Sequence, residues 1–81
     1  MLYAKFMYPD AGYNFDVECA KKAELKIGER YEVEYLSMGQ SNTSIYLKGV
    51  DGCFNSVQFD FEEDDKTPVD IYRNHRYNPY L

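Results

Sequence analysis

The sequence predicts an all-β fold, a small antiparallel barrel of five or six strands with at most one short helical turn. Three runs with a strand-like alternation of apolar and polar residues follow one another at residues 30–38, 43–50 and 53–61. Turn-forming residues separate these runs. Because a chain of 81 residues is too short to cover a flat sheet, we expect the sheet to curl on itself.

The composition limits both the core and the partners. We expect one domain, residues 1–81, with a compact core. Nine Tyr and five Phe supply bulk without Trp, and a Tyr ring can be buried while its hydroxyl reaches water. The net charge of −5 argues against attraction to a polyanion, because phosphate neutralisation requires clustered Lys and Arg. Free nucleic acid is therefore not an expected partner.

The cysteine content and the N-terminus favour a cytoplasmic location. Cys19 and Cys53 are too few for a disulfide framework and lack CxxC spacing. The short apolar run before Pro9 contains Lys5, which is unlike a signal peptide. No apolar run approaches the roughly 20 residues that span a bilayer. We expect reduced cysteines and no membrane association.

The alternation also predicts the core. One face of a first strand carries Leu2, Ala4, Phe6 and Tyr8. The residues expected to face inward from the later runs are Tyr31, Val33, Tyr35, Ile45, Leu47, Val57, Phe59 and Phe61. Asp51-Gly52 predicts a type I′ hairpin turn, since both central residues of such a turn need positive φ. A final strand is expected over residues 67–72.

The segment after the first strand is ambiguous. Phe15, Val17 and Cys19 alternate with acidic residues, which suggests a second short strand. A helix over residues 18–25 would make at most two turns, because Gly28 follows soon after. We predict a turn or a single helical turn here.

Residues 25–33, with the sequence LKIGERYEV, resemble the L-x-x-G-x-x-Y-x-V opening of small Src-homology-3-like barrel proteins of uncharacterised function from Gram-positive bacteria and their phages. The resemblance extends through residues 45–61. It implies that Leu25 and Tyr31 fill a barrel core while Gly28 turns the chain into the strand. It carries no functional residue. The chain lacks Trp and the paired aromatic motif of the eukaryotic versions, so a proline-rich ligand is not expected.

An acidic cluster follows the third run. Its members are Asp60, Glu62, Glu63, Asp64 and Asp65. Converging carboxylates could hold Ca²⁺ or Mg²⁺, but the spacing and the glycine of an EF-hand are absent, so we expect a solvated turn and no metal. In a third interpretation these acids join Glu32, Glu34 and Asp70 in a negative patch that imitates nucleic acid for a basic partner.

The C-terminal tail, residues 72–81, is the second candidate site. The residues proposed for protein interaction are Tyr72, Arg73, Arg76, Tyr77 and Tyr80. Tyr and Arg are enriched at interaction hot spots. Alternatively, the tail packs across the open end of the barrel and covers the core. We expect an ordered tail to do both.

Catalytic signatures are missing from the sequence. His75 is the sole histidine, and no acid or nucleophile is placed beside it. Cys19 and Cys53 lie in strand-like patterns, where a free Cys is usually a small buried hydrophobe. Gly39 and Gly49 are isolated and form no phosphate-binding loop. We expect neither an enzyme nor a cofactor.

Two kinds of function remain. The first is a non-catalytic module that binds a protein through a Tyr-rich surface or a sheet edge, with self-association as one form of it. The second is a small acidic inhibitor or regulator, of the kind mobile elements carry, that engages a basic host protein. Salt should weaken the second interaction far more than the first.

Overall fold

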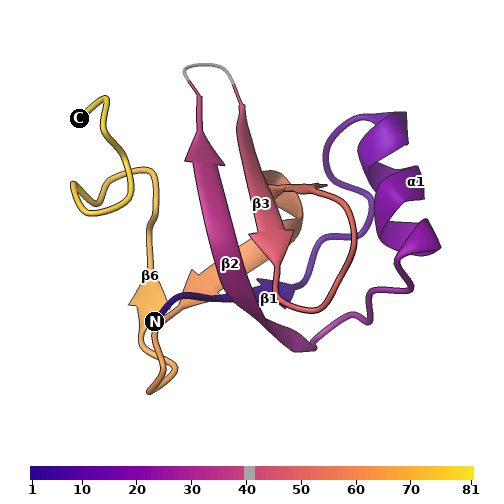
Figure 1. Ribbon diagram of the computed structural model, residues 1–81, viewed down its shortest axis with the longest axis horizontal. Coiled ribbons are helices and arrows are strands. Elements are labelled where there is room, and N and C mark those ends of the chain that lie inside the picture. The colour runs from indigo at the N-terminus through magenta and orange to yellow at the C-terminus, as the bar shows by residue number, and fades with distance from the viewer. Residues whose placement is uncertain (40–41) are drawn as a thin grey trace.

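Figure 1 shows the computed structural model, which describes residues 1–39 and 42–81. In chain order the elements are β1 (Tyr3–Phe6), α1 (Asn14–Lys22), β2 (Arg30–Met38), β3 (Thr43–Leu47), β4 (Phe54–Asn55), the 3-10 turn η1 (Ser56–Gln58), β5 (Phe59–Glu62) and β6 (Pro68–Val69). Neither helical segment of the described residues has the length and apolar character that crossing a bilayer requires.

The six strands of the described residues form one antiparallel sheet in the order β4-β3-β2-β1-β5-β6. The first strand of the chain, β1, lies in the middle, between β2 and β5. The prediction of an antiparallel sheet of five or six strands is therefore confirmed, but the fold is mostly β and not all-β, because it includes α1. The pairings between described residues leave β4 and β6 at the two edges, so the sheet is open. Closure into a Src-homology-3-like barrel stays a prediction.

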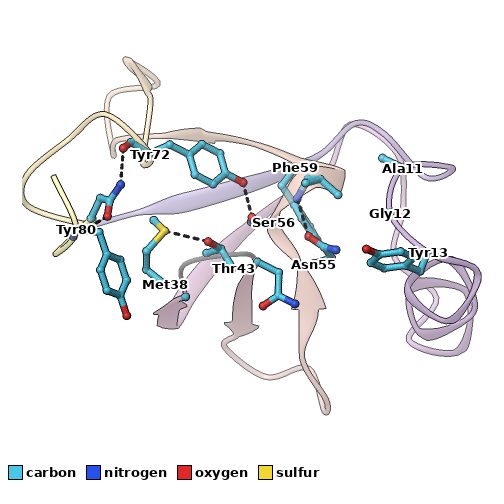
Figure 2. A pocket seen from close by; sticks show the side chains of 14 residues that line it. Ala11, Gly12, Tyr13, Met38, Thr43, Asn55, Ser56, Phe59, Tyr72 and Tyr80 are labelled. Atoms are coloured by element: carbon cyan, nitrogen blue, oxygen red, sulfur yellow. Dashed lines mark hydrogen bonds between the residues drawn. The ribbon is translucent and has the colours of Figure 1, made fainter.

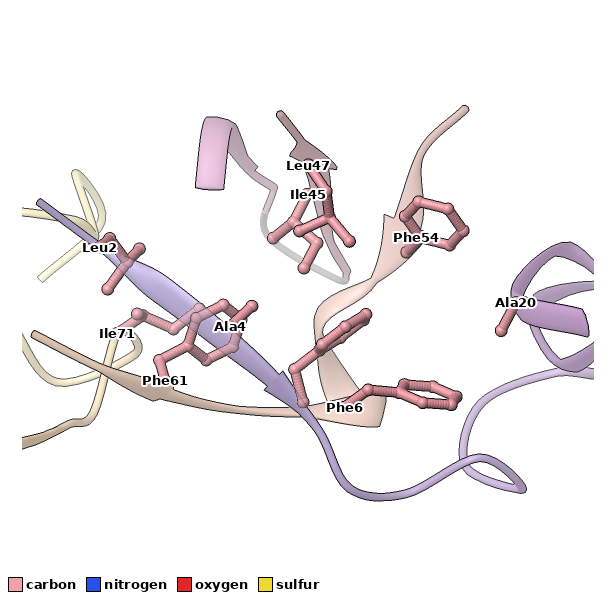
Figure 3. Packing of buried hydrophobic residues seen from close by; sticks show 10 residues of the cluster. Leu2, Ala4, Phe6, Ala20, Ile45, Leu47, Phe54, Phe61 and Ile71 are labelled. Carbon is pink, nitrogen blue, oxygen red and sulfur yellow. The ribbon is translucent and has the colours of Figure 1, made fainter. Parts of the chain in front are cut away.

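The core packs against one face of this sheet (Figure 3). Its buried apolar residues are Leu2, Ala4, Phe6, Ala20, Ile45, Leu47, Phe54, Phe59, Phe61 and Ile71. The inward positions expected in the first strand and in β3 are thus confirmed, as are Phe59 and Phe61, except for Tyr8, which lies beyond β1 and is 46% exposed. Tyr31 and Val33 are half-buried and pack against this cluster. The ring centroid of Phe59 lies 5.4 Å from that of Phe6, its direct cross-strand partner in the β1–β5 pairing.

Helix α1 shows that the prediction of a turn or a single helical turn in this segment is wrong, as is the suggestion of a short second strand. The apolar residues recur every second position over a short stretch and imitate a strand, yet Phe15 is 67% exposed. The helix instead buries Ala20 in the core. Its start is fixed by Asp16, whose carboxylate accepts a hydrogen bond from the backbone N–H of Tyr13 at 2.8 Å.

A β-bulge between Val33 and Tyr35 changes which residues of β2 face the core. Regular alternation predicts Tyr35 inside, but this side chain is 61% exposed and lies opposite Tyr46. The additional residue shifts the alternation by one, so that Leu36 lies opposite the buried Ile45. The expected core position of Tyr35 is therefore wrong.

The third run, residues 53–61, is two strands separated by η1. Val57 lies in this turn and is 47% exposed, so its expected place in the core is wrong. Asn55 starts the turn, because its side-chain oxygen accepts a hydrogen bond from the backbone N–H of Val57 at 3.2 Å. Phe54 and Phe59, on either side of the turn, are buried.

Two further predictions differ from the structure. In the connection from β3 to β4, Gly49 and Gly52 have positive φ (79° and 94°) whereas Asp51 does not, so Asp51-Gly52 does not form the expected type I′ turn. The final strand, expected over residues 67–72, is limited to β6. Beyond β6 the chain forms turns, and Ile71 anchors them in the core.

Candidate functional site

A groove of about 1020 Å³ opens where the loop before α1, the ends of β2 and β3, η1 and the C-terminal tail meet. We call it the tyrosine groove, because Tyr13, Tyr72 and Tyr80 line it. Figure 2 shows Tyr13 at one end and Tyr80 at the other, with Thr43 and other polar residues between them. Segments from both ends of the sequence therefore build one site.

The tail side of the groove is held by Tyr72. Its hydroxyl hydrogen-bonds the buried Ser56 in η1, and Ile71 beside it is buried in the core. The side-chain amide of Asn78 donates to the backbone carbonyl of Tyr72 at 2.6 Å, and the Tyr80 N–H donates to the side-chain oxygen of the same Asn78 at 2.9 Å. These bonds fix the path of the tail, while the Tyr80 side chain itself is 57% exposed.

The opposite side of the groove depends on Asp16. Besides the Tyr13 N–H, its carboxylate accepts a hydrogen bond from the side-chain amide of Asn55 at 3.1 Å. The backbone approaches this carboxylate at Gly12, where φ is 87° and a Cβ would lie 2.8 Å from a carboxylate oxygen of Asp16. Only glycine fits such a position without strain. Asp16 therefore ties the backbone at Tyr13 to the Asn55 side chain of β4.

The floor of the groove is apolar and its rim is polar. Phe59 is buried at the base, and Thr43 donates a hydrogen bond to the sulfur of Met38 at 2.9 Å. The described lining also includes the side-chain amides of Asn42, Asn55 and Asn78, the Ser56 hydroxyl and three tyrosine hydroxyls. No Asp, Glu, His, Cys, Lys or Arg is among the lining residues that the structure describes. Such a surface can pack an apolar side chain and hydrogen-bond a neighbouring peptide group.

The acidic turn, residues 60–65, is tied to the rest of the chain. The Tyr8 hydroxyl donates to the Asp60 carboxylate at 2.9 Å, and this bond raises the pKa of Tyr8. Glu62 forms an ion pair with Arg30, which also donates to the backbone carbonyl of Glu63 at 3.0 Å. Asp60 and Glu62 are therefore already bonded to other parts of the chain, and we assign these two acids a structural role.

The acids at the tip of the acidic turn, Glu63, Asp64 and Asp65, also have partners within the chain. The amino group of Met1 lies 3.9 Å from the Glu63 carboxylate and 3.7 Å from that of Asp64. Hydrogen bonds from the side chain and backbone of Thr67 lower the pKa of Asp65. Within residues 1–39 and 42–81, no group of three or more His, Cys, Asp or Glu residues is arranged to hold a metal ion. The acidic turn thus offers no preformed cation site in the described chain.

The other acids of the proposed negative patch, Glu32, Glu34 and Asp70, are not bonded to the acidic turn. Glu32 pairs with Lys48, at 3.3 Å between the ammonium nitrogen and a carboxylate oxygen. Asp70 accepts a hydrogen bond from the backbone N–H of Tyr72 at 3.0 Å and helps to form the tail turn. Glu34 is exposed in β2. Asp70 also pairs with Arg73, so Glu34 is the one of these three acids that bonds to no side chain of the described residues.

The interaction residues predicted in the tail are Tyr72, Arg73, Arg76, Tyr77 and Tyr80. The structure brings two of the tyrosines to the groove, whereas Tyr77 packs against the core. Burial raises the pKa of Tyr77, and the nearby Glu63 carboxylate adds to the effect. The two arginines are exposed and lie outside the groove lining. The tail is therefore both structural and part of the groove.

The remaining candidates lie elsewhere. His75 borders a smaller hollow of about 500 Å³ beside β6, together with Arg73 and Glu63. Cys19 is half-buried on α1, but Cys53 is exposed, so the prediction of a buried Cys53 is wrong. None of these groups lies in the described lining of the tyrosine groove.

Sequence reasoning missed Tyr13 and Asn55 as groove residues. A local signal for part of this existed, because an acid such as Asp16 is enriched in the first turn of a helix. No local pattern, however, relates Tyr13 to Tyr80 at the other end of the sequence.

Comparisons with known proteins give a family but no activity. A family model described as bacteriophage T4 protein Y07B matches residues 1–81. A relative in enterobacteria phage T4, described as an uncharacterized 11.2 kDa protein in the segB-ipI intergenic region, is 37% identical over 79 residues, which cover 91% of this chain and 83% of that relative. No solved structure matches the chain. These matches support the phage part of the resemblance and carry no link to Gram-positive bacteria or to Src-homology-3-like barrels. The chain belongs to the bacteriophage T4 protein Y07B family.

Proposed function

We propose that the chain is a non-catalytic module that binds a segment of a partner protein in the tyrosine groove. The observation that carries this proposal is that Tyr13, Tyr72 and Tyr80, from distant parts of the sequence, line one groove with an apolar floor. Tyr is enriched at interface hot spots because it offers a large, rigid contact area and a hydrogen-bonding hydroxyl at little cost in side-chain entropy.

The exposure of the lining supports a macromolecular partner. Tyr13 is 75% exposed, Tyr80 57% and Val57 47%. Contiguous apolar surface in solvent is typical of an interaction site. The uncharged lining favours a segment with apolar and neutral polar side chains, since a charged side chain would lose hydration there without gaining a counter-ion.

A binding role also agrees with the chemistry of the groove. The described lining offers tyrosine hydroxyls, amides and two aliphatic hydroxyls, with no His, carboxylate, amine or thiol among these residues that would activate a hydroxyl as a nucleophile. We place this function in the cytoplasm, where the free thiols of Cys19 and Cys53 stay reduced.

The second candidate, an acidic regulator that binds a basic partner through the turn at residues 60–65, has weaker support. The carboxylates of Glu62 and Asp60 already have partners in the fold, and displacing Arg30 or Tyr8 would cost part of the binding free energy. Its support is the net charge of −5 alone.

Affinity capture from phage-infected host cells tests the proposal when matched variants are compared. The test variant is Tyr13→Ser/Tyr80→Ser, in which Ser is also a good residue at the start of α1. The control is Phe15→Ala, which removes an exposed aromatic ring outside the groove lining. We expect a protein that the wild type and the control retain and that the double variant loses. Equal capture by all three proteins would contradict the proposal.

A further inference from the structure

Tyr35 of β2 and Tyr46 of β3 form an exposed aromatic pair on the face of the sheet opposite the core. Their ring centroids are 5.7 Å apart and the ring planes are tilted by 57°. The two residues are 61% and 39% exposed. A tilted pair leaves ring faces open that a parallel stack would cover. Folding alone does not require two large rings side by side in solvent.

The bulge in β2 creates this pair. Without the additional residue between Val33 and Tyr35, the strand alternation would direct Tyr35 to the core, on the same face as Val33. A bulge interrupts the ladder of hydrogen bonds, and such features often re-aim a side chain next to a functional site. Here the bulge moves a tyrosine from the core face to a position opposite Tyr46.

The charge beside the pair is negative. Glu34 lies in the bulge next to Tyr35, is exposed, and forms no ion pair among the described residues. Lys48 follows directly after β3, but its ammonium nitrogen lies 3.3 Å from a carboxylate oxygen of Glu32. No Lys or Arg of the described chain stacks on the rings of Tyr35 or Tyr46.

Elsewhere in the protein, a tyrosine ring binds a cation beside a carboxylate. In β1, the Tyr3 ring carries the guanidinium of Arg30 at 4.2 Å from its centroid, and Arg30 also pairs with the Glu62 carboxylate. A tyrosine ring, a cation and a carboxylate therefore meet in one place. Tyr35, Tyr46 and Glu34 offer the same components with the cation missing from the described chain.

We propose that Tyr35, Tyr46 and Glu34 form a docking point for an exposed Lys or Arg side chain of a basic protein partner. The ring faces attract a cation through their negative quadrupole, and the carboxylate supplies a counter-charge. The chain's net charge of −5 favours the approach of a basic protein and disfavours nucleic acid and anionic lipid. This contact lies on a different face from the core and does not depend on the tyrosine groove.

A peptide titration tests this proposal directly. The probe is a synthetic peptide of alternating Gly and Lys residues, and its matched control has Gln in place of each Lys. Both are titrated into isotope-labelled protein, and amide and ring chemical shifts are followed. We expect the lysine peptide to shift and saturate resonances of Tyr35, Tyr46 and Glu34, and the glutamine peptide to leave them unchanged.

Variants separate an aromatic contact from general attraction to an acidic protein. Tyr35→Phe keeps the ring face and should bind as the wild type does, whereas Tyr35→Leu should weaken the lysine peptide by roughly two- to fivefold. Glu34→Gln should weaken it more than Glu18→Gln, which removes an exposed acid on α1. Tyr13→Ser, in the tyrosine groove, should leave the affinity unchanged.

The variant Tyr35→Leu/Tyr46→Leu decides the outcome, because both residues are exposed and Leu is tolerated in strands; its fold is checked by the amide spectrum. Wild-type affinity of this folded variant for the lysine peptide would overturn the proposal. So would shifts confined to the acidic turn at residues 60–65, since these would show that the peptide binds by charge at that turn.

Discussion

The carboxylate of Asp16 and the side-chain amide of Asn55 are joined by a 3.1 Å hydrogen bond that ties the first turn of α1 to the edge strand β4. The same carboxylate receives the Tyr13 N–H, and the residue is only 7% exposed. One buried acid therefore connects a helix start, a sheet edge and one wall of the tyrosine groove.

Replacing this acid should destabilise the protein. Asp16→Ala removes the buried acceptor of two part-buried hydrogen bonds, so we expect the free energy of unfolding to fall by about 1–3 kcal/mol. Glu18→Ala on the same helix is the control; its side chain is 70% exposed, and we expect a change within about 0.5 kcal/mol. Urea denaturation of the two variants measures the difference, and equal stabilities would contradict the role assigned to Asp16.

Because η1 separates β4 from β5, substitutions at Val57 and at Phe59 should have very different effects on stability. Val57→Asp places a charge on a side chain that is 47% exposed, so it should cost less than about 1 kcal/mol and keep a cooperative melt. Phe59→Ala removes a buried ring and should cost about 3–5 kcal/mol. Thermal melts of both variants check this. Loss of cooperative unfolding in Val57→Asp would show that residues 53–61 form a continuous core strand after all.

These neighbouring positions also show how far the sequence predicts the fold. The burial in β1 and β3 follows from simple alternation, because each strand is regular and has one buried face. A bulge at Tyr35 or a turn at Val57 moves side chains to the other face without changing hydrophobicity, so alternation cannot locate it. Helix α1 was hidden for a related reason, since two periods coincide over a few residues.

The groove was predictable only in part. The composition of the tail identifies Tyr72 and Tyr80 as contact residues, and both line the groove. Their partner Tyr13 is brought to them by tertiary contacts of Asp16 and by the pairing of β1 with β5. Such long-range placement depends on the whole sheet and leaves no local pattern.

Truncation tests the structural part of the tail. A chain ending at Asn74 loses the packed Tyr77 ring and the Asn78 amide that holds the Tyr72 carbonyl. We expect a loss of about 1–3 kcal/mol in unfolding free energy, because apolar burial and a hydrogen bond both disappear. Removal of Leu81 alone, which is 55% exposed, is the matched control and should have little effect. Unchanged stability after the longer truncation would show that the tail only touches a partner.

Stability should also decline at alkaline pH through Tyr77. Its pKa is raised in the folded chain, mainly by burial, so the folded state keeps a proton that the unfolded state loses. The contribution is therefore complete below the unfolded pKa of about 10 and is lost as the pH rises through the folded value. Tyr77→Phe should reduce the loss of unfolding free energy between about pH 9 and 11. An identical alkaline decline in Tyr77→Phe and in the exposed control Tyr80→Phe would contradict this assignment.

The most direct test of the tyrosine groove is the dissociation constant of a purified partner for the wild type, for Tyr13→Ser/Tyr80→Ser and for Phe15→Ala. We predict that the double variant weakens binding by about tenfold or more and that the control does not. We also predict that raising salt from about 0.05 to 0.5 M changes the wild-type affinity by less than about threefold. Wild-type affinity of the double variant, or a collapse of binding in high salt, would contradict a groove-centred function and favour an acidic regulator.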